Sequence, residues 1–129
     1  FLDGFDDTIA RLAADSSTAT FAAQLTSSFG DARRASDWLN NADSTIDKLG
    51  GATPYTRLLG TALAGALCGK ALLAAKAHLD AGELGGADRA FYEGKIVNAR
   101  FFGEQILPAT SGLAVTVMAG SADLFAVDL

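Results

Sequence analysis

A run of residues at alternating spacings of four and three is the feature that most constrains the fold. It covers residues 21–49 and repeats over about four heptads. Its members are Phe21, Leu25, Ser28, Ala32, Ala35, Leu39, Ala42, Ile46 and Leu49. Residues three and four apart lie on one face of a helix, so the run predicts a long helix packed against other helices at shallow angles. A bend is possible at Gly30, and we expect Gly50-Gly51 to end the helix.

Two more helices are predicted on either side of this run. The first is short and covers residues 3–14, followed by a segment of capping residues. The other is expected to begin at Thr53 with Pro54 in its first turn, where a missing N–H costs little, and to reach about Ala81. The first prediction follows from apolar residues at helical spacing, and the second from the cap at Thr53 and the helix-favouring position of Pro54.

Small residues are unusually frequent in the segment 53–81, where Gly65 and Gly69 are four residues apart. Such spacing lets two helices approach closely. The favoured interpretation is tight packing in the core, and the alternative is a groove that accepts a partner. The part from 58 to 77 is apolar enough to suggest a membrane span, but one threonine and two lysines interrupt it. We therefore predict the central helix of a soluble bundle and no transmembrane segment.

The last long helix is predicted to begin with Asp88 as its cap and to break near Pro108. On a helical wheel, one arc of about 160° holds most of its apolar residues. The arc comprises Phe91, Tyr92, Ile96, Ala99, Phe102, Gly103, Ile106 and Leu107. Lys95 falls inside this arc, whereas Val97 and Phe101 lie on the far side of the helix, one turn apart.

Together these patterns predict an all-α fold, an up-and-down bundle of about four helices with the last one broken near Pro108. The chain has 26 alanines and 2 prolines, which favours helix, and no strand-like alternation persists. We expect a single domain over residues 1–129, because no linker or internal repeat divides the chain.

Composition excludes several kinds of function. The net charge is −5 with no basic cluster, which argues against binding to nucleic acid or to an anionic membrane surface. His78 is the only histidine, so no two-histidine metal site can form. Cys68 precedes it by ten residues on the same predicted helix. If that helix is continuous, the two residues are about 15 Å apart along its axis, which excludes a Cys–His dyad. We predict no catalytic, cofactor-binding or metal-binding residue in this chain. The lone cysteine suggests a reducing, cytoplasmic location.

Three runs in the second half carry a resemblance to a known family. They are Thr53-Pro54-Tyr55-Thr56-Arg57-Leu58-Leu59-Gly60, Phe91-Tyr92-Glu93-Gly94-Lys95-Ile96-Val97-Asn98-Ala99-Arg100-Phe101-Phe102, and Ile106-Leu107-Pro108. In these runs the chain resembles the extra C-terminal helical domain of acyl-CoA dehydrogenases, in particular the subgroup like 3-methylmercaptopropionyl-CoA dehydrogenase. The resemblance implies a parent enzyme that performs α,β-dehydrogenation of acyl-CoA thioesters, with FAD held by a separate core domain.

The resemblance also implies what this chain does within the parent. It would be an accessory, non-catalytic domain that packs against the core domain, supports a homo-oligomer or shapes the acyl pocket. The catalytic glutamate and the flavin would belong to the core. Glu83, Glu93 and Glu104 do not match the catalytic motif, so none of them is expected to have a catalytic or flavin-binding role.

Three residues of the last long helix are singled out for possible contacts. Val97 and Phe101 are bordered by charge and are the candidate interface, although burial beneath the short first helix is equally open. Lys95 can extend its ammonium to water from an otherwise apolar arc. Alternatively, it contacts the phosphates of acyl-CoA or forms an ion pair with the core domain.

Two other functions remain open at this point. The first is a stand-alone helical dimerisation or binding module without enzymatic role, in which the run over residues 21–49 pairs with a second copy. The second is a helical sac for an apolar ligand, suggested by the eight phenylalanines.

Overall fold

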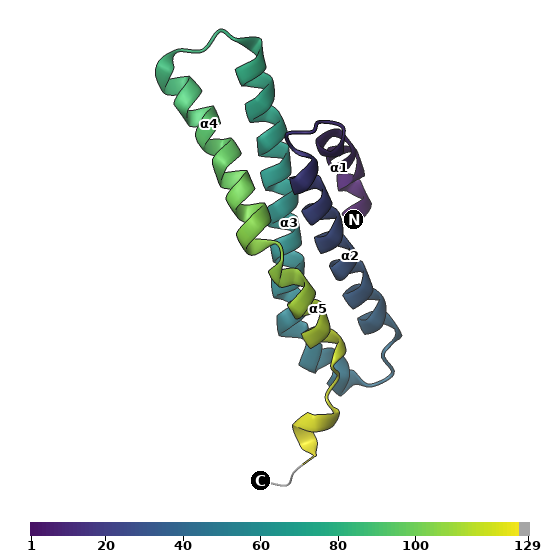
Figure 1. Cartoon of the computed structure of the whole chain (residues 1–129). Helices are drawn as coiled ribbons and strands as arrows, with labels where there is room; N and C mark the ends of the chain where they lie inside the picture. The colour runs from purple at the N-terminus through teal and green to yellow at the C-terminus, as the bar shows by residue number, and fades with distance from the viewer. Residues whose placement is uncertain (127–129) are drawn as a thin grey trace.

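The computed structural model describes residues 1–126, apart from the side chain of Phe125, and consists of helices joined by short turns and loops, without a strand in that range (Figure 1). The elements in chain order are η1 (Leu2–Phe5), α1 (Asp6–Ala13), α2 (Ala19–Asn41), α3 (Thr45–Ala81), α4 (Gly86–Phe101), the π-helical turn η2 (Phe102–Ile106), α5 (Ala109–Met118) and η3 (Ala122–Phe125). α2, α3 and the broken α4–η2–α5 run up and down, with short α1 packed on α2 and α3. The predicted all-α bundle, with its last helix broken near Pro108, is confirmed.

The central helix is α3, which contacts α1, α2, α4 and α5. Its glycines bring these neighbours close. A Cβ atom at Gly69 would lie 2.9 Å from Leu12 Cδ1, and one at Gly51 would lie 3.2 Å from Leu39 Cδ2. Gly65 and Gly69 are buried by the chain's own helices. Tight core packing is therefore confirmed for these two positions, and a groove open to a partner there is wrong.

By length and composition alone, α3 is also the one helix among residues 1–126 that could cross a membrane. Its most apolar window of 18 residues has a mean hydropathy of 1.7, and 39% of that window is buried. The core helix of a soluble bundle can meet the same criterion, and α3 packs against four other helices. These contacts agree with its predicted place at the centre of a bundle.

The predicted helix over residues 21–49 is wrong in its second part. α2 continues through Gly30 but ends at Asn41, and α3 begins at Thr45. Ser44 caps α3, since its Oγ accepts a hydrogen bond from the Asp47 amide at 3.3 Å. Asn, Asp and Ser residues near this turn favour helix caps over helix interiors. Their preference prevails here over the helical spacing of the apolar residues. The last two residues of the predicted run, Ile46 and Leu49, are 51% and 71% exposed.

The predicted helix start at Thr53 is wrong as well. Gly50-Gly51 do not end a helix, and Pro54 lies inside α3 rather than in its first turn. Gly51 is buried where α3 meets α2 and α5. Tertiary packing therefore favours a helical backbone there, although glycine is a weak helix former. Pro54 removes one backbone hydrogen bond, which the long helix tolerates.

Two details of the last long helix also differ from expectation. α4 begins at Gly86 without a side-chain cap, so Asp88 lies in its first turn instead of capping it. Phe91, predicted on the buried arc, is exposed. The wheel assumed one continuous α-helix, whereas η2 is a π-helical turn that shifts the register of the residues after Phe101. Gly103 in this turn is buried against Phe21 of α2.

Candidate functional site

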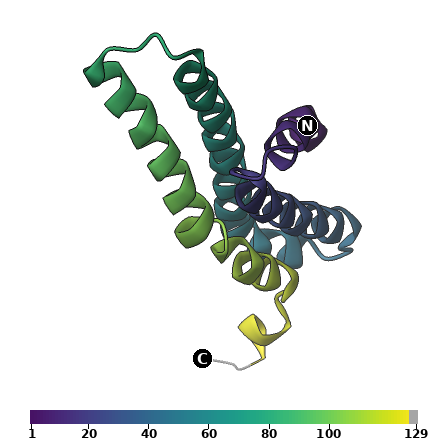
Figure 2. The ribbon, with the colours of Figure 1, turned by 45° about the horizontal axis from the view of Figure 1, so that its top comes forward.

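α4 contacts α3 through one of its faces. Tyr92 and Ile96 are partly buried and Ala99 is buried, and the Tyr92 ring stacks on His78 of α3 with 4.5 Å between centroids. The two views of the ribbon place α4 at the edge of the bundle, on the far side of α3 from α1 (Figures 1 and 2). The opposite face of α4 therefore has no neighbouring helix among residues 1–126.

This opposite face carries large apolar side chains in solvent. Phe91, Val97 and Phe101 are 58%, 61% and 59% exposed. The full set at spacings of three and four, which we call the outer α4 face, is Ala87, Ala90, Phe91, Gly94, Val97, Asn98 and Phe101. Small residues prevail toward the start of α4, and the end carries Val97 and Phe101. A contiguous exposed apolar patch of this kind marks a contact surface more often than isolated residues do.

Val97 and Phe101, the candidate interface residues, both lie on the outer α4 face in the structure. Burial beneath the first helix is wrong, because α1 packs on α2 and α3 and leaves both side chains exposed. Their role as an interface stays a prediction. The sequence analysis missed Phe91, because the wheel placed it in the buried arc.

Lys95 lies beside the outer α4 face. Its side chain is exposed, and its Nζ lies over the Phe91 ring, 5.0 Å from the centroid. The nearby Cys68 thiol has a pKa raised by partial burial, and the charge of Lys95 opposes part of this rise. Whether Lys95 contacts acyl-CoA or another protein stays a prediction.

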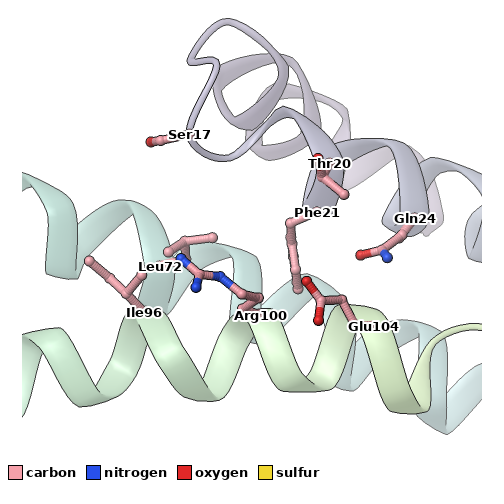
Figure 3. A pocket seen from close by; sticks show the side chains of 8 residues that line it. All are labelled: Ser17, Thr20, Phe21, Gln24, Leu72, Ile96, Arg100 and Glu104. Carbon is pink, nitrogen blue, oxygen red and sulfur yellow. The ribbon is translucent and has the colours of Figure 1, made fainter.

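A small cleft of about 130 Å³ separates the start of α2 from α4 (Figure 3). Its lining residues are Ser17, Thr20, Phe21, Gln24, Leu72, Ile96, Arg100 and Glu104. Figure 3 shows Thr20 and Gln24 projecting from α2, with Arg100 of α4 and Glu104 of η2 across from them. Three of the lining side chains are apolar and five are polar. The polar ones supply both hydrogen-bond donors and hydrogen-bond acceptors to the cleft.

One end of this cleft is held by a hydrogen-bonded cluster. Ser17 donates to Asp15 through its amide and its hydroxyl, and Lys76 Nζ donates to Ser17 Oγ at 2.7 Å. The hydrogen bonds from Ser17, together with Lys76, lower the pKa of Asp15 to about 2. Because Lys76 is on α3, this cluster joins the α1–α2 connection to the central helix.

A buried carboxylate that the sequence analysis missed joins α2 to α5. Asp31 is 2% exposed and forms an ion pair with Arg34. Its Oδ2 accepts hydrogen bonds from Thr110 Oγ1 at 2.8 Å and from Ser111 Oγ at 3.1 Å. The sequence offered one sign of this burial, because Asp31 lies between Ser28 and Ala32, two members of the run at spacings of four and three. Asp31 thereby holds the start of α5 just after the break in the last helix.

Among residues 1–126, no group of three or more His, Cys, Asp or Glu side chains could hold a metal ion. α3 is continuous between Cys68 and His78, which separates them by about 15 Å along the axis as expected. The structure thus has three features of interest, which are an exposed apolar face on α4, a small cleft with polar side chains, and two hydrogen-bonded clusters that join helices.

A comparison with protein-family models gives a match. The family model described as acetyl-CoA dehydrogenase C-terminal like matches residues 1–128. A search of curated proteins gave no match. The match covers the first half of the chain as well as the runs after Thr53 that carried the resemblance. The resemblance to one particular subgroup stays a prediction.

Proposed function

The chain belongs to the acetyl-CoA dehydrogenase C-terminal-like family, and on this premise we propose that it is an accessory, non-catalytic domain of an FAD-dependent acyl-CoA dehydrogenase. The parent enzyme performs α,β-dehydrogenation of acyl-CoA thioesters, and its core domain supplies the catalytic glutamate and holds FAD. We expect the parent to be cytoplasmic and homo-oligomeric. The work of this domain is to make a protein–protein contact that supports the assembled enzyme.

The observation that carries this proposal is the outer α4 face. Phe91 and Phe101 together expose roughly 240 Å² if a phenylalanine offers about 200 Å². At about 25 cal/mol per Å², covering each ring contributes roughly 3 kcal/mol before the costs of association. A soluble chain that leaves two rings and a valine uncovered on one helix gains considerably from a partner there.

Lys95 contributes at the rim of this contact. Its ammonium lies over the Phe91 ring and beside the apolar residues. A charge at the rim of an interface affects the rate and the salt dependence of association more than affinity. We therefore assign Lys95 to an ion pair with the partner protein, in preference to the phosphates of acyl-CoA.

The test is Phe101→Ser in the full-length protein that carries this chain. The control is Val115→Ser on α5, because Val115 is 68% exposed, no less than Phe101, but lies outside the outer α4 face. We expect Phe101→Ser to weaken assembly in sedimentation velocity or to lower the thermal midpoint, and the control to do neither. If Phe101→Ser changes neither assembly nor stability, the proposed function fails.

The alternative of a stand-alone module that dimerises through residues 21–49 loses its basis. Leu25, Ala32 and Ala35 are fully buried within the chain's own bundle, and the run is interrupted at residues 42–44. The phenylalanine sac has no basis either. Phe21 and Phe29 are core residues, whereas Phe91 and Phe101 lie in solvent, so these rings do not line one internal space.

A further inference from the structure

We propose that the cleft between the start of α2 and the last long helix binds a small zwitterion, a molecule with a carboxylate at one end of a short apolar chain and an ammonium at the other. The carboxylate binds Arg100, the ammonium binds Glu104, and the apolar chain lies on Phe21. This site is separate from the outer α4 face, so the inference does not depend on the proposed protein–protein contact.

The first argument is how the backbone forms the cleft. η2 packs tightly on α2, since a Cβ atom at Gly103 would lie 2.5 Å from Gln24 Oε1 and 2.7 Å from Phe21 Cδ2. On the N-terminal side of this contact, α4 packs on α3 and diverges from α2 (Figures 1 and 2). The cleft lies where the two helices separate, beside the π-helical turn. Such turns are rare and occur frequently at functional sites.

The second argument is that polar side chains around the cleft are available to a ligand. Among residues 1–126, no side-chain hydrogen bond or ion pair involves four of the lining residues, Thr20, Gln24, Arg100 and Glu104. Arg100 and Glu104 are four apart, a spacing that brings side chains together on a continuous α-helix. Here the π-helical turn begins between them and changes the register. Both charges therefore remain open to a ligand.

The third argument is the distribution of charge along the cleft. In Figure 3 the guanidinium of Arg100 lies toward Leu72. The carboxylate of Glu104 lies toward Gln24. A simple anion at Arg100 would be opposed by Glu104, and a simple cation at Glu104 would be opposed by Arg100. A ligand with both charges can form a charge-assisted hydrogen bond at each end without such opposition.

The fourth argument is size. The cleft has a volume of about 130 Å³, close to the ~150 Å³ of an apolar cavity that accepts benzene. Phe21, Leu72 and Ile96 offer apolar contact between the two charged ends. Residues four apart rise about 6 Å along a helix, so opposite charges separated by three methylene groups fit better than those of an α-amino acid. γ-Aminobutyrate has this arrangement and is the probe for the experiments.

The first experiment is isothermal titration of the full-length protein with γ-aminobutyrate, butyrate and butylamine. We expect γ-aminobutyrate to bind with a dissociation constant on the order of 1 mM, because few atoms make the contact. Butyrate and butylamine each lack one charge and should bind at least about tenfold more weakly. Glycine, which is too short to reach both residues, should bind as weakly as they do. No binding of γ-aminobutyrate up to about 50 mM overturns the inference.

The second experiment locates the bound probe with variants that remove one charge each. Arg100→Gln and Glu104→Gln should each weaken the binding of γ-aminobutyrate about tenfold. Arg89→Gln is the control, because Arg89 is also an exposed arginine of α4 but lies outside the cleft. It should leave the dissociation constant within about twofold of the wild-type value. All three side chains are exposed, so we expect every variant to fold.

The pattern across the variants decides the outcome. If only Arg100→Gln weakens binding, the cleft is a site for simple anions and the inference is wrong. If neither cleft variant differs from Arg89→Gln, the probe binds elsewhere and the inference is wrong as well. As an independent readout, saturating γ-aminobutyrate should slow amide hydrogen exchange at residues 100–106, because the ligand joins these residues to α2. Unchanged exchange there also overturns the inference.

Discussion

The backbone of Gly65 in α3 lies directly against Leu107, so that a Cβ atom at Gly65 would lie 2.7 Å from Leu107 Cδ2. Leu25 Cδ1 of α2 would lie 3.2 Å from the same Cβ atom. Gly65 therefore sets how closely α2, α3 and the segment after η2 approach one another. The close packing of the last helix at its break depends on this one missing side chain.

We expect Gly65→Val to lower the free energy of unfolding by about 2–3 kcal/mol, because an overpacked core forces its neighbours to shift. The measurement is urea unfolding followed by far-UV circular dichroism. Gly60→Val in the same helix is the control, since a Cβ at Gly60 meets nothing within 4 Å. That variant should change stability by less than about 0.5 kcal/mol. Similar losses in both variants would contradict close packing at Gly65.

The buried carboxylate of Asp31 gives a second prediction. Asp31→Ala leaves Ser111 without its acceptor and Thr110 with only the Leu107 carbonyl. We expect a loss of about 2–3 kcal/mol in the free energy of unfolding, and a smaller loss for Asp31→Asn, which keeps an acceptor oxygen. Asp37→Ala, an exposed acid on the same helix, should change stability by less than about 0.5 kcal/mol. An Asp31→Ala variant as stable as Asp37→Ala would show that the network contributes nothing.

The cluster around Asp15 predicts a dependence of stability on pH. Its pKa is lowered from 3.8 to about 2 by the Ser17 hydrogen bonds and by Lys76. A carboxylate with a lowered pKa in the folded state stabilises the protein above the unfolded pKa, and this contribution disappears as the pH falls toward the folded value. Between pH 4 and pH 2 the thermal midpoint should fall more in the wild type than in Asp15→Asn. Parallel curves for the two proteins would remove this role of Asp15.

Lys95 offers a test that separates its two proposed contacts. We expect Lys95→Met to leave the affinity of the parent enzyme for acyl-CoA within about twofold and to reduce the salt dependence of assembly. Lys70→Met is the control, because the Lys70 ammonium lies over Phe5 and away from α4. Isothermal titration with acyl-CoA and sedimentation over a salt series measure the two effects. A large loss of acyl-CoA affinity in Lys95→Met would instead assign Lys95 to the phosphates.

Part of the candidate site could be predicted from the sequence alone. Val97 and Phe101 stand out because they lie off the arc that holds Ile96 and Ala99, and helical periodicity is a local property of the chain. Phe91 could not be assigned in this way. Whether Phe91 lies on the buried or the exposed face of α4 depends on where α3 contacts α4 and on the π-helical turn that follows. The spacing of apolar residues in the sequence does not reveal either of these.

The sequence by itself determined the helical class and the break near Pro108. It also placed Val97 and Phe101 off the buried arc of the last long helix, and the tertiary structure decided that α1 does not cover them. Helix propensity, the missing N–H of proline and the period of a helix act over a few residues. The tertiary structure decided where α2 ends and that Gly50, Gly51 and Pro54 lie inside α3. It also decided that Asp31 is buried against α5. These outcomes depend on contacts between segments far apart in the chain, and the packing energy there exceeds the roughly 1 kcal/mol by which a glycine disfavours helix.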